Sequence, residues 1–405
     1  MNKQRIPGDS DTQNQEAVPV FLKSLHLQNF LSFGPETPEF ALGPLNLLIG
    51  PNGTGKSNFI EALYFLRASR ADFDEPIRKG GGVQEWIWKG SSKGFASLSA
   101  VITNAKEGRP LRHVIEFEAD QQRFHLRDER IEYASPDYGK NEPYFFYKYQ
   151  KGKPVLNVKG DQRQLTRETV EADNSILAQR KDPEQYPEIT YLGQQYSGIR
   201  AYREWAFGRN TVFRSPQPPD MRSNRLEEDF SNLGLFLNQM KRSPAAKNKI
   251  LHYLHDLYAG ADDFDIIFGG NTVQVYLTEK DFSIPATRLS DGTLRYLCLL
   301  AILCDPNPPP LICIEEPELG LHPDILPKIA DLLVEASERT QLIVTTHSEV
   351  LVDAMTDRPE AVVVCEKHDG QTEMNRLSSS DLKEWLKKYR LGQLWMRGDL
   401  GGTRW

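Results

Sequence analysis

The chain has 405 residues, of which 39% are hydrophobic and 26% charged, and its formal net charge is −7. This length fits one large or two ordinary domains, and the negative balance excludes an overall polycation for nucleic acid while leaving a local basic patch open. No apolar run reaches the roughly 18 residues that a membrane span needs. Residues 1–19 lack the apolar core of a signal peptide. Their polar composition predicts a disordered tail. We expect a cytoplasmic protein.

The four cysteines predict buried thiols and exclude a disulfide or zinc framework. All of them lie in apolar surroundings and no two form a C-x-x-C pair. That pattern is typical of a chain in a reducing compartment.

The first half of the chain predicts a strand–loop–helix unit followed by an antiparallel sheet. Alternating apolar and polar residues over 95–133 are typical of antiparallel strands. In chain order we expect strands at 21–33 and 45–49, a helix at 57–70, a turn at 80–82, the sheet at 95–133, irregular structure or a further hairpin at 134–175, and a strand at 189–192.

The second half alternates strands and helices, which predicts a parallel sheet after residue 294. The expected elements are an exposed connector at 200–225, helices at 226–240 and 245–258, a hairpin at 264–277, an apolar helix at 294–303, a strand at 311–314, a helix at 327–337, a strand at 341–345, a helix at 349–355, a strand at 361–366, and a short helix capped by Ser379 or Ser380.

A phosphate-binding loop is the most specific motif. Residues 50–57 fit the pattern G-x-x-x-x-G-K-[ST], between a buried strand and a helix. Backbone N–H groups and the helix N-terminus then point at the phosphates. Lys56 is expected on the β- and γ-phosphates and Ser57 on Mg²⁺. The candidate nucleotide-binding residues are Asn52, Gly53, Thr54, Gly55, Lys56, Ser57 and Asn58.

Two carboxylates end the strand at 311–314, the edge at which an α/β sheet places ligand chemistry. We expect Glu315 to support Mg²⁺, directly or through water. Glu316 is expected to polarise the attacking water as general base. The alternative is an acidic turn after a strand.

Two further motifs supply an anion site and a histidine. Ser290, Asp291 and Gly292 open an apolar helix, and the Ser290 hydroxyl and Gly292 N–H predict a second anion site. His347 ends an apolar strand, where it can sense the γ-phosphate and orient water. As alternatives, the first motif is a simple turn and the histidine is hydrogen-bonded at a strand end.

Taken in order, these motifs resemble those of ABC-type ATPases of the RecF/SMC/OLD group, within the predicted ATPases labelled AAA_21. The sequence LSDGT resembles the ABC signature, IEEPE the Walker B motif, ELGLHPD the D-loop and His347 the switch histidine. The first of the Walker B acids is usually Asp, and here it is Glu315. The closing RLGQLWMRGDLGGTRW resembles a compact subgroup of these ATPases. The motifs are matched over about residues 20–75 and 285–355, the middle only in outline.

The resemblance implies an α/β P-loop NTPase with an ABC-ATPase-like head, a parallel-sheet core, an antiparallel β subdomain and a helical lobe. It divides the chain into a tail at 1–19, an ATPase lobe with the P-loop at 20–200, a connector and helical lobe at 201–293, a Walker B and switch-histidine half at 294–377, and a closing helix and tail at 378–405. ATP and Mg²⁺ are the implied cofactors.

The resemblance also implies a homodimer, or a higher oligomer, that closes head-to-tail around ATP. Ser290, Asp291 and Gly292 of one copy would then contact the nucleotide held by the other. A Q-loop glutamine joins Mg²⁺ to the helical lobe in that family. Gln194, beside Gln195, is our first choice and Gln84 the second, with a surface glutamine as the alternative.

The chain lacks the heptad repeats of long-armed SMC proteins between Lys56 and Glu316, and no D-x-D cluster typical of a Toprim nuclease follows His347. We therefore expect an ATP-hydrolysing switch that controls a separate effector, such as a Toprim-like or other nuclease, in anti-phage defence or DNA repair.

Two alternatives remain open at this point. One is an ATP-binding scaffold with little turnover. The other is a DNA-binding module, suggested by basic residues interleaved with aromatic ones. These are Arg200, Tyr202, Arg203, Trp205, Arg209, Phe213, Arg214, Arg222 and Arg225, followed by Lys241, Arg242, Lys247 and Lys249. A solvated, charged face or a partner contact is the simpler interpretation of that cluster.

Overall fold

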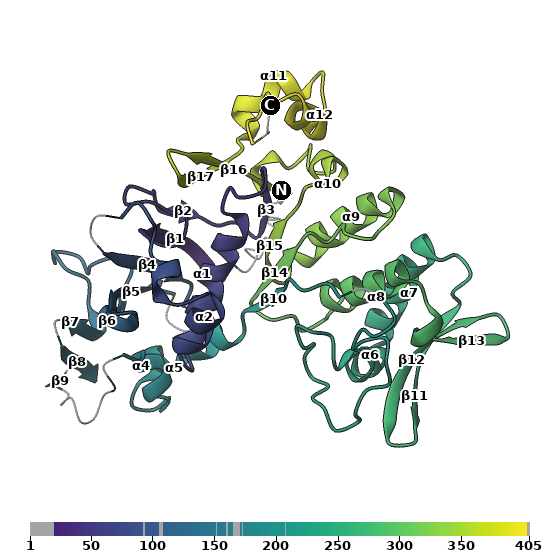
Figure 1. Ribbon diagram of the computed structural model, residues 1–405, viewed down its shortest axis with the longest axis horizontal. Helices are drawn as coiled ribbons and strands as arrows, with labels where there is room; N and C mark the ends of the chain where they lie inside the picture. The colour runs from purple at the N-terminus through teal and green to yellow at the C-terminus, as the bar shows by residue number, and fades with distance from the viewer. Residues whose placement is uncertain are drawn as a thin grey trace, which may run out of the picture.

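The computed structural model describes residues 20–91, 94–104, 108–150, 152–158, 161–164, 171, 173–206 and 208–402. The tail predicted at 1–19 lies outside the described residues. Figure 1 shows a central sheet flanked by an antiparallel lobe on one side and a helical lobe on the other. None of the helices in the described ranges combines the length and the apolar character needed to cross a bilayer.

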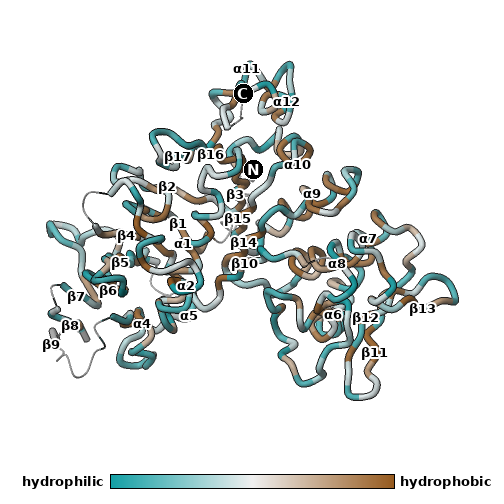
Figure 2. The backbone as a smooth tube through the Cα atoms, in the orientation of Figure 1, coloured by the Kyte–Doolittle hydropathy of each residue, from teal (hydrophilic) through white to brown (hydrophobic). Residues whose placement is uncertain are grey.

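The central sheet has six strands in the order β10-β14-β15-β3-β16-β17, parallel except for the edge strand β17. Near-continuous apolar runs form its middle strands, as expected for a sheet covered on both faces; Figure 2 shows this hydrophobic centre. The strands are β3 (Leu45–Ile49), β10 (Arg200–Tyr202), β14 (Leu311–Glu315), β15 (Gln341–Thr345), β16 (Val362–His368) and β17 (Gln371–Arg376).

The two faces of this sheet pack into two different cores. Alternate residues along β3 separate, with Leu47 in one core and Leu48 in the other. The Leu48 face packs against helices α1 (Lys56–Ala68) and α5 (Pro187–Ser197) and the antiparallel lobe. The Leu47 face packs against α8 (Asp291–Leu303), α9 (Leu326–Ala336), α10 (Glu349–Asp353) and α12 (Leu391–Met396).

The antiparallel lobe is an eight-stranded sheet in the order β2-β1-β4-β5-β6-β7-β8-β9. It confirms the antiparallel strands predicted at 95–133. Of the two alternatives for 134–175, the described residues form the further hairpin. Its strands are β1 (Leu22–Gln28), β2 (Phe40–Ala41), β4 (Phe95–Ile102), β5 (Leu111–Asp120), β6 (Arg123–Tyr133), β7 (Phe145–Gln150), β8 (Lys153–Val158) and β9 (Asp161–Gln164). Three short helices accompany it, α2 (Asp74–Lys79), α3 (Val83–Trp86) and α4 (Ile176–Gln179).

The helical lobe joins α8 to helices α6 (Leu233–Lys241) and α7 (Pro244–Leu257) and to a three-stranded sheet. That sheet confirms the hairpin predicted at 264–277 and adds a third strand; it comprises β11 (Asp263–Gly269), β12 (Thr272–Glu279) and β13 (Phe282–Pro285). Short 3₁₀ turns occur at η2 (Ala286–Arg288), η3 (Pro323–Ile325) and η4 (Pro359–Ala361). Helix α11 (Ser379–Leu386) precedes α12.

Two strands predicted from the sequence differ from the structure. The strand expected at 189–192 is wrong because Pro187 starts helix α5, whose residues Ile189, Leu192 and Tyr196 are buried at helical spacing. The strand expected at 21–33 ends at Gln28.

The connector expected to be exposed at 200–225 instead holds the buried strand β10, and Phe213 and Arg214 are also buried. The five-segment division of the chain stays a prediction. The four cysteines are buried and free, as expected.

Candidate active site

The P-loop connects β3 to α1 in the predicted conformation. Gly50, Gly53 and Gly55 have φ values of 140°, 82° and 98°. The Lys56 ammonium curls back over the loop and donates to the carbonyl oxygens of Gly50 at 2.7 Å and Pro51 at 2.9 Å. Burial lowers the pKa of Lys56. The ammonium therefore lies within the loop that the phosphates are expected to enter.

The remaining loop residues differ in their surroundings. Thr54 is buried and its hydroxyl donates to the Pro51 carbonyl at 2.9 Å. The Asn58 amide donates to the Ser32 hydroxyl at 2.8 Å. Asn52 and Gly53 are exposed at the tip of the loop.

Ser57 and Glu315 form the oxygen-donor set expected for Mg²⁺. The Ser57 hydroxyl is hydrogen-bonded to the Glu315 carboxylate, and burial is the main cause that raises the pKa of Glu315. Hydroxyl and carboxylate oxygens suit Mg²⁺, which takes one or two protein ligands together with substrate phosphates. The described residues contain no group of three or more His, Cys, Asp or Glu side chains placed to bind a metal unaided. The pair therefore fits the metal without forming a cage of its own.

Arg203 is a residue of this site that sequence reasoning did not assign to it. It follows β10, which pairs in parallel with β14 and so brings Arg203 beside the end of that strand. Its Nε donates to Glu315 Oε1 at 3.0 Å and its Nη1 to Glu61 Oε1 at 2.5 Å. Arg203 thus links the candidate metal ligand to helix α1.

Gln194 does not lie where a metal ligand is required. It is exposed on α5, near the C-terminal end of that helix. Helix α5 ends beside Pro310: a Cβ built on Gly198, the residue that caps this helix, would lie 2.7 Å from Pro310 Cδ. Pro310 precedes β14, so Gln194 is at the opposite edge of the sheet from the P-loop. Arg203, nine residues further on, contacts the Glu315 carboxylate instead.

Glu316 and His347 come together at the carboxyl ends of β14 and β15. Glu316 Oε1 lies 3.8 Å from His347 Nε2, and each side chain is about one-third exposed. Glu316 has φ 48°, a left-handed conformation that few non-glycine residues adopt and that clusters at functional sites. The backbone N–H of His347 donates to Glu318 Oε1 at 2.8 Å, which fixes the turn that carries the histidine.

Two side chains of the helical lobe hold the backbone around Glu316. Arg295 Nη2 donates to the Glu316 carbonyl at 2.6 Å, and Trp205 Nε1 donates to the Glu315 carbonyl at 2.7 Å. The Arg295 guanidinium also lies 4.1 Å from the centre of the Trp205 ring. Because Arg295 belongs to α8, the helix that starts with the LSDG motif, that helix contacts the candidate general base directly.

The LSDG motif caps α8 as predicted. The Ser290 hydroxyl accepts from Thr293 N at 3.0 Å and the side chain is exposed. The Asp291 carboxylate instead turns into its own chain, where it pairs with buried Arg214 at 2.5 Å and accepts from Gly208 N at 3.2 Å. Ser290 and Gly292 are therefore the motif residues at the exposed helix start, while Asp291 anchors the loop.

The basic cluster considered for nucleic acid is largely engaged inside the fold. Arg200 donates to the Ile199 carbonyl, and Arg203 and Arg214 form the ion pairs described above. The lysines pair with acids as well, Lys247 with Asp263 at 2.6 Å and Lys249 with Glu335 at 2.5 Å. These contacts give the cluster a structural role.

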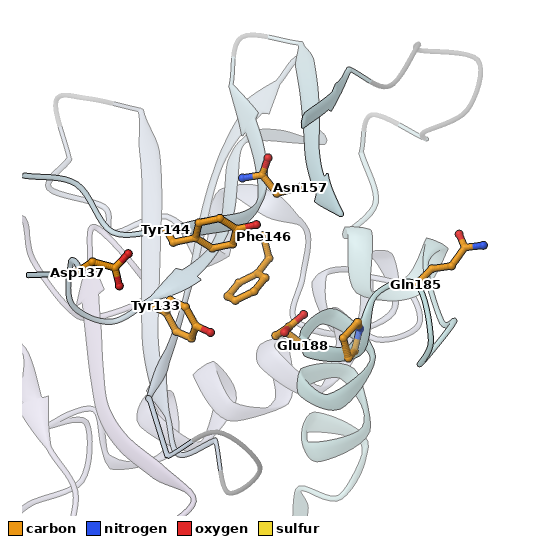
Figure 3. A pocket seen from close by; sticks show the side chains of 8 residues that line it. Tyr133, Asp137, Tyr144, Phe146, Asn157, Gln185 and Glu188 are labelled. Atoms are coloured by element: carbon orange, nitrogen blue, oxygen red, sulfur yellow. The ribbon is translucent and has the colours of Figure 1, made fainter. Parts of the chain in front are cut away.

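A separate cavity of about 360 Å³ lies in the antiparallel lobe, between β7 and the start of α5 (Figure 3). Three aromatic rings, Tyr133, Tyr144 and Phe146, line it together with Asp137 and Glu188. The Arg109 guanidinium already covers the Tyr133 ring at 3.8 Å and pairs with Asp137 at 2.8 Å. None of the motif residues lines this cavity, so it is not the nucleotide site.

Residues 45–353 match the protein family described as "AAA domain, putative AbiEii toxin, Type IV TA system". The chain belongs to this family. Its relatives among characterised proteins include a DNA replication and repair protein RecF of Streptococcus uberis, 46% identical over 52 residues, which are 13% of this chain and 14% of RecF. A chromosome partition protein Smc of Mycolicibacterium paratuberculosis is 32% identical over 99 residues, 23% of this chain and 8% of Smc. The chain thus matches only a small part of these relatives' length.

Solved structures of SMC heads share the fold. A head bound to the C-terminal winged-helix domain of ScpA has a TM-score of 0.54 at 16% identity, covering 89% of this chain and 99% of that one. A head with an extended coiled coil from Pyrococcus furiosus, bound to the C-terminal domain of ScpA, gives 0.53 at 15% identity, covering 91% and 99%. These matches confirm the P-loop head fold. With the family match they make the chain an ABC-type ATPase of the RecF/SMC group.

Proposed function

We propose that this ATPase is a molecular switch in which two copies close head-to-tail around ATP and hydrolysis reopens them. The observation that carries the proposal is the convergence of Lys56, Ser57, Glu316 and His347 at one sheet edge, while the exposed Ser290 helix start belongs to the other lobe. A helix N-terminus with free N–H groups attracts anions. Exposed on its own chain, it is suited to the γ-phosphate held by a second copy.

Each residue then has a physical task in the reaction. The P-loop N–H groups and the Lys56 ammonium bind the β- and γ-phosphates, and Ser57 and Glu315 hold the metal. Mg²⁺ would supply charge neutralisation at the phosphates. Glu316 accepts a proton from the attacking water, a role that contributes about 10²–10⁴-fold in rate. His347, 3.8 Å from that carboxylate, orients the same water or the phosphate.

The experiment compares two site variants with two surface controls. Lys56→Ala should abolish nucleotide binding, whereas Lys23→Ala, at an exposed position on β1, should not. Glu316→Gln should keep ATP binding, hydrolyse slowly and accumulate dimer, because the amide cannot accept the proton. Glu338→Gln, an exposed acid, serves as its control. Light scattering with ATP measures the dimer, and a Glu316→Gln protein that stays monomeric would exclude the head-to-tail arrangement.

We further propose that the closed dimer controls a separate effector protein, with a nuclease as the chemistry that best fits. The support is the repair function in the name of the RecF relative. Capture from native cells with Glu316→Gln, but not with Lys56→Ala, should recover the effector. If both variants capture the same proteins, or neither captures any, ATP-dependent effector control is excluded.

A further inference from the structure

After α12 the described chain returns to the central sheet, where Gly402 lies near the P-loop. Gly402 N donates to Glu366 Oε1 on β16 at 2.9 Å, and the Gly402 carbonyl accepts from Trp395 Nε1 at 3.2 Å. A Cβ built on Gly402 would lie 3.5 Å from Gly50 Cα, the first glycine of the P-loop. A methyl group at position 402 would therefore make van der Waals contact with the first glycine of the P-loop.

The start of the same segment is fixed to the helix that follows His347. Arg390 Nε pairs with Asp353 Oδ2 at 2.5 Å, and Leu391 N donates to Thr356 Oγ1 at 3.1 Å. A Cβ on Gly392 would lie 2.7 Å from the Glu349 carbonyl, so only a glycine allows this close contact between α12 and α10. Residues 390–402, which we name the closing segment, thus run from contacts with α10 to Gly402 near the P-loop. Figure 1 shows α12 beside α10.

We propose that the closing segment is a positioning element of the nucleotide site, with Gly402 as its contact residue. Gly50 itself packs closely on β16, because a Cβ there would meet the Cys365 carbonyl at 2.2 Å. The Gly50 carbonyl in turn holds the Lys56 ammonium at 2.7 Å. A shift of the backbone at Gly402 therefore reaches Lys56 through one intervening residue.

Glycine is required at position 402 for two reasons. Its φ of 65° is a conformation that L side chains rarely adopt. A methyl group there would also lie 2.8 Å from Val364 Cγ1. Gly402→Ala must then shift the segment relative to Val364 on β16, next to its contact with Gly50. The Gly50 carbonyl accepts the hydrogen bond from the Lys56 ammonium. We therefore expect Gly402→Ala to bind nucleotide more weakly, although no residue of the P-loop motif has changed.

The test measures ADP binding by calorimetry and steady-state ATP hydrolysis on the full chain. Gly402→Ala should raise the Kd for ADP and the KM for ATP about tenfold, the factor that corresponds to about 1.4 kcal/mol. The value of kcat at saturating ATP should stay within about twofold, because Glu316 is untouched. Gly270→Ala is the matched control, since Gly270 also has a positive φ, 57°, but an added methyl meets nothing within 4 Å.

Two variants of Glu366 test the same contact without changing the backbone at Gly402, and so apply even if Gly402→Ala fails to fold. Glu366→Gln keeps an oxygen acceptor for Gly402 N and should bind ADP like the wild type. Glu366→Ala removes that acceptor and should weaken ADP binding in the same direction as Gly402→Ala. The melting temperature without nucleotide, measured for each variant, separates loss of fold from loss of positioning.

The inference rests on the nucleotide site proposed above, and the outcomes separate the two. If the wild type and Lys56→Ala bind ADP equally poorly, the nucleotide site itself is wrong. If the wild type binds ADP and Gly402→Ala binds it equally well, the positioning role of the closing segment is wrong. A lowered melting temperature with unchanged Kd and KM would also overturn it, because the segment would then only stabilise the fold.

Discussion

Replacing Arg203 tests the least expected feature of the site. Arg203→Leu removes a cation that joins Glu61 to Glu315, with the three side chains 23%, 31% and 17% exposed. Each hydrogen bond to a charged group contributes about 1.5–3 kcal/mol when shielded from water. Partial exposure of these side chains reduces that value. We therefore expect the loss of both Arg203 hydrogen bonds to lower the free energy of unfolding by about 2 kcal/mol. For a large domain this lowers the melting temperature by about 4 °C.

The effect on activity follows from the charge of Glu315. Burial already raises the pKa of this carboxyl, and Arg203 opposes the rise. Without Arg203 the carboxyl takes up its proton at higher pH, and a protonated carboxyl is a poor metal ligand. The acidic limb of the pH–rate profile should therefore move to higher pH, and more Mg²⁺ should be needed for half-maximal ATP hydrolysis.

The assay is phosphate release between about pH 5 and 9 at several Mg²⁺ concentrations. Arg203→Gln provides the comparison, because a glutamine is the residue that the RecF/SMC/OLD resemblance places near the metal. It should retain more activity than Arg203→Leu, which has no hydrogen-bonding group. If the acidic limb and the Mg²⁺ requirement of Arg203→Leu match the wild type, Arg203 does not act on Glu315 in the working enzyme.

Two further predictions concern the turns that carry the other motifs. Burial is the main cause that raises the pKa of Glu318 above its ordinary 4.5, so its charge costs stability as pH rises through that raised value. Glu318→Gln keeps the acceptor for His347 N. At pH 8 its free energy of unfolding, obtained from thermal melting, should exceed that of the wild type by about 1 kcal/mol. This difference should vanish toward pH 4.5. Arg214→Ala removes the donors to Asp291 and to the Leu289 carbonyl. It should cost about 3 kcal/mol or more in denaturant unfolding, whereas Arg209→Ala at an exposed position should cost little.

Much of the site was predictable because the P-loop, the Walker B acids and the switch histidine each follow a buried apolar strand. Strands ending at Ile49, Glu315 and Thr345 are neighbours in one parallel sheet, so their carboxyl ends meet at one edge. Local sequence identifies such strands well, since a covered parallel strand is an apolar run. The meeting of Lys56, Glu315 and His347 therefore required no knowledge of the rest of the fold.

Arg203 could not be predicted in the same way. Its strand, β10, has only three residues, and two of them are Arg200 and Tyr202, so no periodic signal marks it. The preceding residues 189–192 suggested a strand by composition, although Pro187 and the spacing of buried residues indicate a helix. That error placed Gln194 near the metal and left Arg203 unassigned. Edge strand β17 was missed because its sequence, QTEMNR, is mostly polar.

The order of strands in the central sheet has a consequence for synthesis of the protein. β3 pairs with β15 and β16, and about 290 residues separate the end of β3 from the start of β15. At about 5–20 residues per second, the ribosome delivers those partners some 15–60 seconds after the P-loop strand. During that interval the apolar run Leu45–Ile49 has neither neighbour and is open to chaperones or to wrong pairing. The nucleotide site of this protein can thus form only late in translation, once the strands from both halves of the chain are outside the ribosome.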